Sequence, residues 1–369
     1  MLPHDYSGPE GLDDTLSAGW GKYPLDSVFV RTESRSVGEI VRRVNAGRYQ
    51  LDPDFQRDFV WPLNKQSRLI ESCLMRIPLP VFYVAEAMDG TIVVVDGLQR
   101  LTTLKRFLGD EFALSGLDDA SVETKNLLTG KRFSELSINL QERIEDTQLI
   151  LYVLDAKAPE RARLDIFERV NSGVPLSRQQ MRNCLYNGRA TQWLKQAAES
   201  SEFLKATGGS LDKKSMRDRE VINRFCAFHL LGYESYQSGD MDEFLARSLR
   251  EINTMNEGET KKMHAQFLRA MANNHKLFQE HSFRRSLLSD GGSGRSAINI
   301  ALYDVCSVLL SHYGEDMVVE GGEKIKSAVR KLLEDSDFVS AITHSTNSTK
   351  QVRARFTMMD AALKEALPC

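Results

Sequence analysis

The run IVVVDGLQRLTTLKRFL, residues 92–108, joins a strand to a helix through a single glycine and decides the class of the fold. Its first part is rich in β-branched side chains, which is typical of a buried strand. In its second part, Leu101, Leu104 and Leu108 recur at the spacing of one apolar helix face. Gly97 separates the two patterns. The run therefore indicates a domain in which strands and helices are mixed.

The amino end of this helix has the chemistry of an anion site. If Gly97 lies near the N-cap, the amides of Leu98, Gln99 and Arg100 have no partner inside the helix. These amides and the positive end of the helix dipole attract an anion such as a phosphate. Glycine lets a phosphate approach the backbone, and Arg100 supplies a forked, permanently charged donor.

Three neighbouring side chains extend this prediction. The hydroxyls of Thr102 and Thr103 are candidate phosphate contacts. Asp96, at the end of the strand, is a candidate to hold a metal ion or to orient water. The alternative is a structural ion pair between Asp96 and Arg100 in a tight strand-to-helix turn. The spacing alone favours the ion pair, because such turns are common, and it does not separate binding from structure.

A second cluster lies upstream in LDPDFQRDFVWPLNKQ, residues 51–66. Gln56, Arg57, Trp61 and Gln66 lie in a segment with weak secondary-structure signals, and such side chains on a loop are candidate ligand contacts. In the alternative, the aromatic residues belong to the core and Arg57 pairs with a neighbouring aspartate. The residues are compatible with both interpretations.

Alternation, capping residues and turn residues predict the other elements. They indicate a strand at 27–32, a helix capped by Ser36 and stopped by Gly47, a helix capped by Asn64 with an apolar stripe from Leu69 to Ile77, a hairpin around Asp89–Gly90 and a central strand at 148–155. From residue 158 onward the pattern is helical, and Ser177 with Gln180 forms a capping box. We therefore predict an α+β protein with an extension at 1–26, a mixed α/β domain at 27–157 and a helical domain at 158–369.

Length and charge limit the classes of function. The 369 residues fit two domains, and 41% hydrophobic with 27% charged residues exclude a disordered chain. The net charge of −3 excludes the overall basic surface of a nonspecific nucleic-acid coat. Residues 107–170, however, hold 13 acidic and 8 basic residues, whereas residues 171–224 hold 5 acidic and 10 basic ones. If the protein binds DNA, we therefore expect it to do so through a local basic patch.

The candidate DNA contacts in the basic segment are Lys213, Lys214, Arg217 and Arg219. In the alternative, the arginines of KKSMRDREVINR, Arg224 included, form ion pairs along an exposed helix face. A run of mixed sign favours the ion pairs, and the local basic excess favours DNA.

The sequence predicts a cytoplasmic protein without a metal centre. Neither an apolar run of membrane-spanning length nor a secretory signal is visible. The five cysteines are scattered, without the close spacing of a zinc site, and no acidic cluster predicts a bound metal.

Four segments together resemble a known family. FQRDFVWPLNKQSRLIESCLMRIPLP, VVDGLQRLTTLKRFL, FERVNSGVPLSRQQMRNCLY and KSMRDREVINRFCAF are similar to the N-terminal domain of GmrSD-type restriction enzymes, the DGQQR family, with weaker similarity at 347–356. The resemblance implies a stand-alone member with a ParB/sulfiredoxin-like fold, in which a Gly-x-x-Arg turn binds nucleotide phosphates. It also implies a place in a bacterial system that restricts modified or phage DNA.

Carried over by position, the resemblance assigns its motif to particular residues. Its functional positions fall on Asp96, Gly97, Gln99, Arg100, Gln56, Arg57, Gln66 and Asn171. Leu98 replaces the first glutamine of the motif, so a side chain that would orient attacking water is lost, while phosphate binding by the backbone is kept. Leu98 also replaces the catalytic cysteine of sulfiredoxins, which excludes their activity.

We predict a protein that binds and hydrolyses an NTP, GTP or ATP, with Asp96, Gln99 and Arg100 as catalytic residues and Mg²⁺ as a compatible cofactor. The alternatives are a non-hydrolysing module that nucleotide switches for DNA or partner binding, and a DNA nickase or endonuclease. The expected partners are nucleotide, DNA and a partner subunit or second copy, and no membrane. The His–Asn–His nuclease site of two-part family members has its nearest counterpart in Asn274, His275 and His281, which better fit a solvated helix face.

Overall fold

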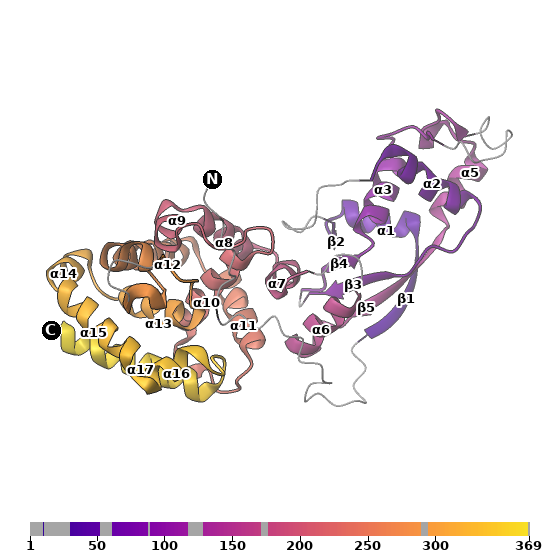
Figure 1. Ribbon diagram of the computed structural model, residues 1–369. Coiled ribbons are helices and arrows are strands. Elements are labelled where there is room, and N and C mark those ends of the chain that lie inside the picture. The colour runs from indigo at the N-terminus through magenta and orange to yellow at the C-terminus, as the bar shows by residue number, and fades with distance from the viewer. Residues whose placement is uncertain are drawn as a thin grey trace. The chain divides into compact units, whose positions relative to one another are not determined.

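The computed structural model describes residues 10, 30–51, 61–87, 89–116, 128–170, 176–288 and 294–367. The chain forms two compact units (Figure 1). The first unit is Trp20–Asn187, and the second consists of Gly188–Cys369 together with Met1–Gly19. The first unit is built on a sheet and the second on helices, so the predicted α+β class is confirmed. The sequence predicts a boundary between residues 157 and 158, whereas the first compact unit continues to Asn187.

The first unit is organised around a mixed sheet of five strands within the described residues. The strands are β1 (Val30–Ser36), β2 (Tyr49–Gln50), β3 (Phe82–Glu86), β4 (Ile92–Asp96) and β5 (Gln148–Leu154), in the order β1-β5-β3-β4-β2. β1 with β5 and β3 with β4 are antiparallel pairs, whereas β3 with β5 and β2 with β4 are parallel. β5 is thus an internal strand, as its apolar run predicts.

Helices cover one face of this sheet (Figure 1). They are α1 (Val37–Asn45), α2 (Leu63–Leu74), α3 (Leu98–Leu108) and α5 (Ile138–Glu145), with the 3-10 turn η1 (Phe133–Glu135) nearby. Alternate strand residues such as Val84, Val94 and Leu151 share a core with these helices. On the other face, Val93 and Val95 are also buried, and α7 (Arg178–Leu185), which follows α6 (Glu160–Val170), contacts β4. β4 is therefore buried on both faces, as its continuous apolar run predicts.

Local sequence signals identify several ends of elements correctly. Ser36 accepts a hydrogen bond from the amide of Glu39 at 3.3 Å and caps α1. Ser177 and Gln180 form the predicted capping box of α7. Gly90 has a φ of 78° in the turn between β3 and β4, in keeping with the predicted hairpin.

Helix α2 differs from its prediction at both ends. It starts directly after Pro62, whose φ of −64° suits a helix start, so Asn64 lies in the first turn and is not the N-cap. The helix ends at Leu74, and Ile77 is 47% exposed instead of belonging to the buried stripe. The predicted cap and the predicted end of the stripe are both wrong.

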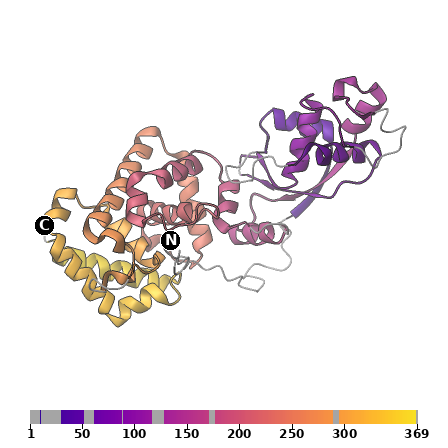
Figure 2. The same cartoon turned by 45° about the horizontal axis from the view of Figure 1, so that its top comes forward.

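The second unit is helical, and its helices pack around α13. The elements are α8 (Arg189–Glu199), α9 (Ser201–Thr207), α10 (Arg217–Leu231), η2 (Tyr233–Ser235), α11 (Met241–Thr254), α12 (Glu257–Phe278), η3 (Gln279–His281), η4 (Arg285–Leu288), α13 (Ile300–Leu310), α14 (Glu315–Glu320), α15 (Gly322–Glu334), α16 (Ser336–Thr343) and α17 (Thr349–Ala366). Every residue of α13 is buried, and α10, α12, α16 and α17 contact it. The last three helices, drawn in yellow shades, pack on one another (Figure 2). Among the described helices, none is both long and apolar enough to cross a membrane.

A buried charge network joins three of these helices. Arg224 of α10 donates to both carboxylate oxygens of Asp304 in α13, at 2.9 and 2.6 Å. Arg355 of α17 donates to the same carboxylate at 2.9 Å. None of the three side chains is more than 2% exposed. The interpretation that places Arg224 on an exposed helix face is therefore wrong, because a distant aspartate holds it in the core.

The amino end of the chain contributes to the second unit. The amide of Glu10 donates to the carbonyl of Ile298 at 2.8 Å, and the carbonyl of Glu10 accepts from the amide of Ile300 at 3.0 Å. Glu10 and Asn299 thereby form a parallel bridge. In chain order, the first unit is inserted between two parts of the second.

A half-buried histidine lies among α10, α12 and α13. The ring nitrogens of His229 lie 3.1 Å from Oε1 of Gln266 and 3.4 Å from Oγ of Ser311. Its ring stacks on Phe225 and has its centroid 6.0 Å from that of His312. Burial lowers the pKa of His229 below its ordinary value of 6.5, and His312 lowers it further. Burial also lowers the pKa of His312.

The stability of the second unit is expected to fall on acidification. Because the pKa of His229 is lower in the folded than in the unfolded chain, the unfolded chain binds more protons as the pH falls through 6.5. The contribution of His229 to the free energy of unfolding is therefore fully present above pH 6.5 and is lost below it. Each kcal/mol lost lowers the Tm by about 2–4 °C. Thermal melts between pH 7.5 and 5.5 measure this loss, and His229→Gln should flatten the profile. An equal slope in the variant would contradict the assignment to His229.

Candidate functional site

The turn between β4 and α3 requires glycine. Gly97 is the N-cap of α3 and has a φ of 101°, in the left-handed region. Phe82 of the neighbouring strand β3 lies directly against it, so a Cβ at this position would overlap Cδ1 and lie 2.8 Å from Cε1 of that ring. The amino end of α3 has no side-chain cap within the described residues, which leaves main-chain amides as its donors.

Arg100 is bound to the backbone and to the acid of the same motif. Its guanidinium donates to Oδ2 of Asp96 at 2.9 Å, to the carbonyl of Val81 at 3.1 Å and to the carbonyl of Pro80. It lies over the ring of Phe82, 4.1 Å from the centroid. The side chain is 12% exposed, and burial lowers its pKa while Asp96 opposes the shift. The ion pair that the spacing favours is present, and Arg100 fastens the turn to the start of β3.

Asp96 is the accessible member of this pair. Its side chain is 45% exposed, against 12% for Arg100. Hard cations prefer such carboxylate oxygens, and the amino end of α3 beside it attracts anions. The turn therefore combines groups that suit a metal ion and groups that suit the phosphates it would accompany.

Gln66 and Gln99 both hold the peptide groups of Trp61. Nε2 of Gln66 donates to the Trp61 carbonyl at 2.8 Å, and Oε1 of Gln99 accepts from the Trp61 amide at 3.3 Å. Nη1 of Arg106 donates to Oε1 of Gln66 at 3.2 Å, and Gln66 is 4% exposed. Both amide oxygens and the Gln66 nitrogen are thus used inside the protein. We call this arrangement the Trp61 clamp.

Of the remaining predicted site residues, Thr102 and Thr103 belong to the described part of the chain and three others do not. Thr103 is fully buried, and its hydroxyl donates to the carbonyl of Gln99 at 2.7 Å, one turn earlier in α3. Thr102 is half-buried in the same turn. Gln56, Arg57 and Asn171 lie outside the described residues.

Helix α7 presents buried polar side chains that the sequence analysis does not single out. Gln179, Arg182 and Asn183 are each at most 2% exposed. Nε2 of Gln179 donates to Oδ1 of Asn183 at 2.9 Å, and Nη1 of Arg182 donates to Oε1 of Gln179 at 3.1 Å. Helix α7, which carries these side chains, contacts β4, the strand that ends at Asp96. The sequence signal for this cluster is the i, i+3 and i+4 spacing of the three residues, which places them on one helix face within a segment that resembles the family.

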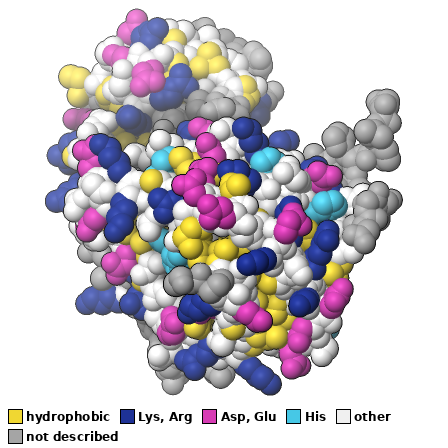
Figure 3. All heavy atoms as spheres, turned by 90° about the vertical axis from the view of Figure 1, so that its left-hand side faces the viewer, with side chains coloured by type: hydrophobic (Ala, Val, Ile, Leu, Met, Phe, Trp, Pro, Cys, Tyr) yellow, Lys and Arg dark blue, Asp and Glu magenta, His cyan; other side chains and the backbone are white. Residues whose placement is uncertain are grey.

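The basic segment of the second unit is a mixture of exposed lysines and internal contacts. Lys213 and Lys214 are exposed just before α10. Arg217 pairs with Glu220 at 3.1 Å, and Arg219 donates to Sδ of Met216 at 3.7 Å. The intrahelical ion pair of the alternative interpretation is thus present for Arg217. On the face drawn in Figure 3, the coloured basic and acidic side chains are interspersed.

The histidine pattern does not assemble a nuclease site. Asn274 is fully buried, and its amide nitrogen donates to the carbonyls of Ala270 and Cys306. His281 has Nδ1 2.9 Å from Oγ of Ser286. The prediction of a solvated face is wrong for Asn274, which is a core residue. In the described part of the chain, no group of three or more His, Cys, Asp or Glu is placed to hold a metal ion.

The comparison with known families concerns the first unit. The model of one family, described as "GmrSD restriction endonuclease, N-terminal domain", matches residues 37–187. The match starts with the first residue of α1 and ends at Asn187, where the first compact unit ends. It includes the Asp96–Arg100 turn, the Trp61 clamp and α7. No curated protein matches the chain. Residues 37–187 therefore belong to the family of GmrSD restriction endonuclease N-terminal domains.

Proposed function

We propose that this domain binds an NTP, GTP or ATP, at the Asp96–Arg100 turn, within a restriction or defence system. The observation that carries the proposal is the combination at the end of β4: a glycine N-cap with left-handed φ, a helix amino end without a side-chain cap among the described residues, and an exposed carboxylate. Backbone amides at a helix start favour phosphates. The family match supports the link to restriction.

Each residue of the turn has a role that its contacts suggest. The amides at the start of α3 hold phosphates, and Asp96 holds Mg²⁺ or orients water. Arg100 is already shared among Asp96 and two carbonyls, so it acts by positioning the turn. Because Gln66 and Gln99 grip Trp61, they act on the segment before it, which carries Gln56 and Arg57 in the sequence.

The apolar side chain of Leu98 and the hydrogen bond that the Gln99 side chain already makes favour slow hydrolysis. In phosphoryl transfer, positioning of the attacking water supplies much of the rate. The side chain of Leu98 offers no hydrogen bond, and Oε1 of Gln99 accepts a hydrogen bond from the amide of Trp61. The second candidate is therefore a domain that binds nucleotide without turnover and passes its occupancy to a partner subunit or to DNA, with Lys213 and Lys214 as exposed candidate contacts.

Phosphate release and nucleotide binding by the full chain test this proposal. Asp96→Asn should lower release from GTP or ATP by about tenfold or more, because a charged group at the reacting phosphate is lost. Asp146→Asn, an exposed carboxylate on the same unit, should leave release unchanged. Calorimetric binding without release would favour the non-hydrolysing candidate. No binding of any NTP, with and without Mg²⁺ or DNA, would contradict both.

A further inference from the structure

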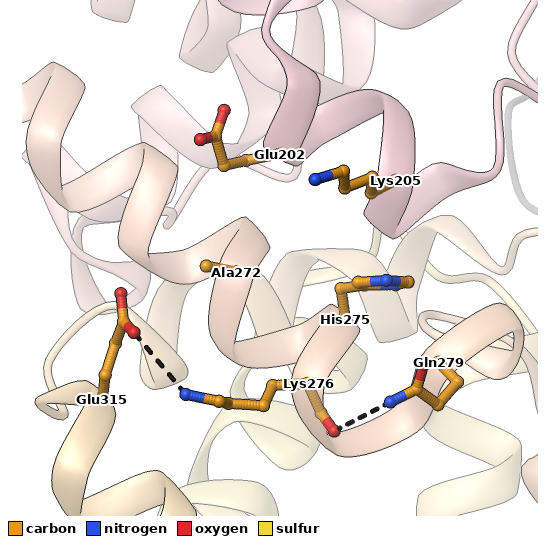
Figure 4. A pocket seen from close by; sticks show the side chains of 7 residues that line it. All are labelled: Glu202, Lys205, Ala272, His275, Lys276, Gln279 and Glu315. Carbon is orange, nitrogen blue, oxygen red and sulfur yellow. Dashed lines mark hydrogen bonds and ion pairs between the residues drawn. The ribbon is translucent and has the colours of Figure 1, made fainter.

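A hollow of about 400 Å³ opens on the second unit between α9, α12 and α14 (Figure 4). This volume lies in the range of pockets that take small molecules. Ala272 of α12 lies between longer side chains and leaves the floor of the hollow open. All three helices belong to the second unit, whereas the Asp96–Arg100 turn belongs to the first.

Cationic groups line the hollow from two sides. Lys205 of α9 extends into it (Figure 4), and among the described residues its ammonium makes no ion pair. Lys276 of α12 has its ammonium 3.6 Å from the carboxylate of Glu315 in α14, which is a loose pair. An anion placed in the hollow would therefore meet one uncommitted ammonium and a second that is only weakly held.

His275 adds a directional donor between the two lysines. Its Nδ1 is buried and has no hydrogen-bond partner among the described residues. A buried N–H without an acceptor loses its hydrogen bond to water entirely, so the hydrogen is better placed on Nε2. The ring then offers an N–H on the edge that is not enclosed. His275 lines the hollow, which makes that edge a candidate donor to a bound anion.

Gln279, one of the residues that line the hollow, has a strained backbone. It follows α12 directly, with a φ of 49° and a ψ of −131°, although it is not glycine. Non-glycine residues in such conformations persist where the surroundings hold them, and they gather at ligand sites. Its amide nitrogen is 3.4 Å from the carbonyl of Lys276, which keeps the side chain at the rim (Figure 4).

We propose that this hollow binds a small organic molecule that carries a single phosphate or carboxylate group. Lys205, His275 and Lys276 would hold the anionic group. Glu202 and Glu315 also line the hollow, and their negative charge disfavours an extended polyanion such as a triphosphate or a nucleic-acid backbone. The remaining space over Ala272 takes an uncharged body. The site is independent of the nucleotide turn and of its proposed function.

Calorimetry with the full chain tests the site, with inorganic phosphate, glycerol 3-phosphate and glycerate as probes. At least one organic probe should bind saturably. Lys205→Met should weaken its binding about tenfold or more, because a charged hydrogen bond is lost. Ala272→Phe should abolish binding by filling the floor while keeping every charge. Lys324→Met removes an exposed lysine outside the hollow and should change nothing.

The organic probes distinguish the two anionic groups that the hollow could hold. Binding of glycerol 3-phosphate alone identifies a phosphate group, and binding of glycerate alone identifies a carboxylate. No saturable binding of either organic probe overturns the proposal. Binding that survives both Lys205→Met and Ala272→Phe, or that Lys324→Met also removes, overturns it as well. Circular dichroism of each variant verifies that a loss of binding is not a loss of fold.

Discussion

Asp304→Asn is expected to lower the free energy of unfolding of the second unit by about 3–5 kcal/mol, as is typical when one partner of a buried ion pair is removed. Asp304 is the carboxylate that both Arg224 and Arg355 contact in the core. Asparagine keeps the shape and removes the charge. Two buried guanidinium groups would then lose the carboxylate that both of them contact. The loss is a large fraction of the ~5–15 kcal/mol that hold a typical protein folded.

The network contains one more cation than anion, which increases the expected effect. Burial lowers the pKa of Arg355 to about 10, with Asp304 opposing that shift. Even so, Arg355 keeps its proton at neutral pH. Its Nε is buried without a partner in the described part of the chain, although Nη1 donates to the carbonyl of Thr346 at 2.5 Å. Asp304 is thus the main compensation for two desolvated charges.

Denaturant titration of Asp304→Asn against wild type measures the loss. Asp360→Asn is the matched control, because Asp360 pairs with Lys364 on the surface and should contribute no measurable stability. Replacing Arg224, Asp304 and Arg355 together by Met, Leu and Met should recover most of the loss, since a well-packed apolar set often substitutes for a buried ion network. A loss below about 1 kcal/mol for Asp304→Asn would contradict the central role of this carboxylate.

Gly97→Ala is expected to lower the free energy of unfolding of the first unit by about 2–5 kcal/mol, the sum of a backbone effect and a packing effect. Of this, about 1–2 kcal/mol reflects an L side chain in the left-handed region. The rest, about 1–3 kcal/mol, reflects the overlap of the new methyl group with Phe82, which forces β3 and α3 apart. The same displacement would disturb the contacts of Arg100 with Pro80 and Val81, and NTP binding should fall with stability.

Gly90→Ala provides the matched control for Gly97→Ala. Gly90 lies at the other end of β4 with a φ of 78°, but a Cβ there meets no atom of the described residues within 4 Å. It should therefore show only the backbone part of the loss, about 1–2 kcal/mol. Urea unfolding of both variants isolates the effect of Phe82 as the difference between them. Equal losses would show that the close packing of Gly97 on Phe82 is unimportant.

Features that depend on neighbours in the sequence could be predicted from it. The strand and helix on either side of Gly97, the capping box of Ser177 and Gln180 and the Asp89–Gly90 turn are each specified within a few residues. The Asp96–Arg100 pair joins the last residue of β4 to the first turn of α3, and the two residues are only four positions apart in the sequence. These interactions need no tertiary contact to be recognised, since helix and turn geometry alone bring the groups together.

The rest depends on contacts between distant parts of the chain. Gln99 is 38 residues from Trp61, so its amide could be assigned to a nucleotide but not to a backbone clamp. Arg224 is 80 residues from Asp304, and a run of mixed charges gives no sign that one arginine is buried. The hollow around Ala272 needs α9 and α14 to meet α12, which no periodicity reveals.

The bridge between Glu10 and Asn299 has a consequence for the order in which the protein is made. During synthesis, residues near the amino end emerge first, yet their hydrogen-bond partners at Ile298 and Ile300 come hundreds of residues later. The first unit, Trp20–Asn187, is complete by then, whereas the second must wait for its final helices before it can close. A ribosome-bound chain therefore passes through a stage in which the unit that carries the Asp96–Arg100 turn is finished and the helical unit is not.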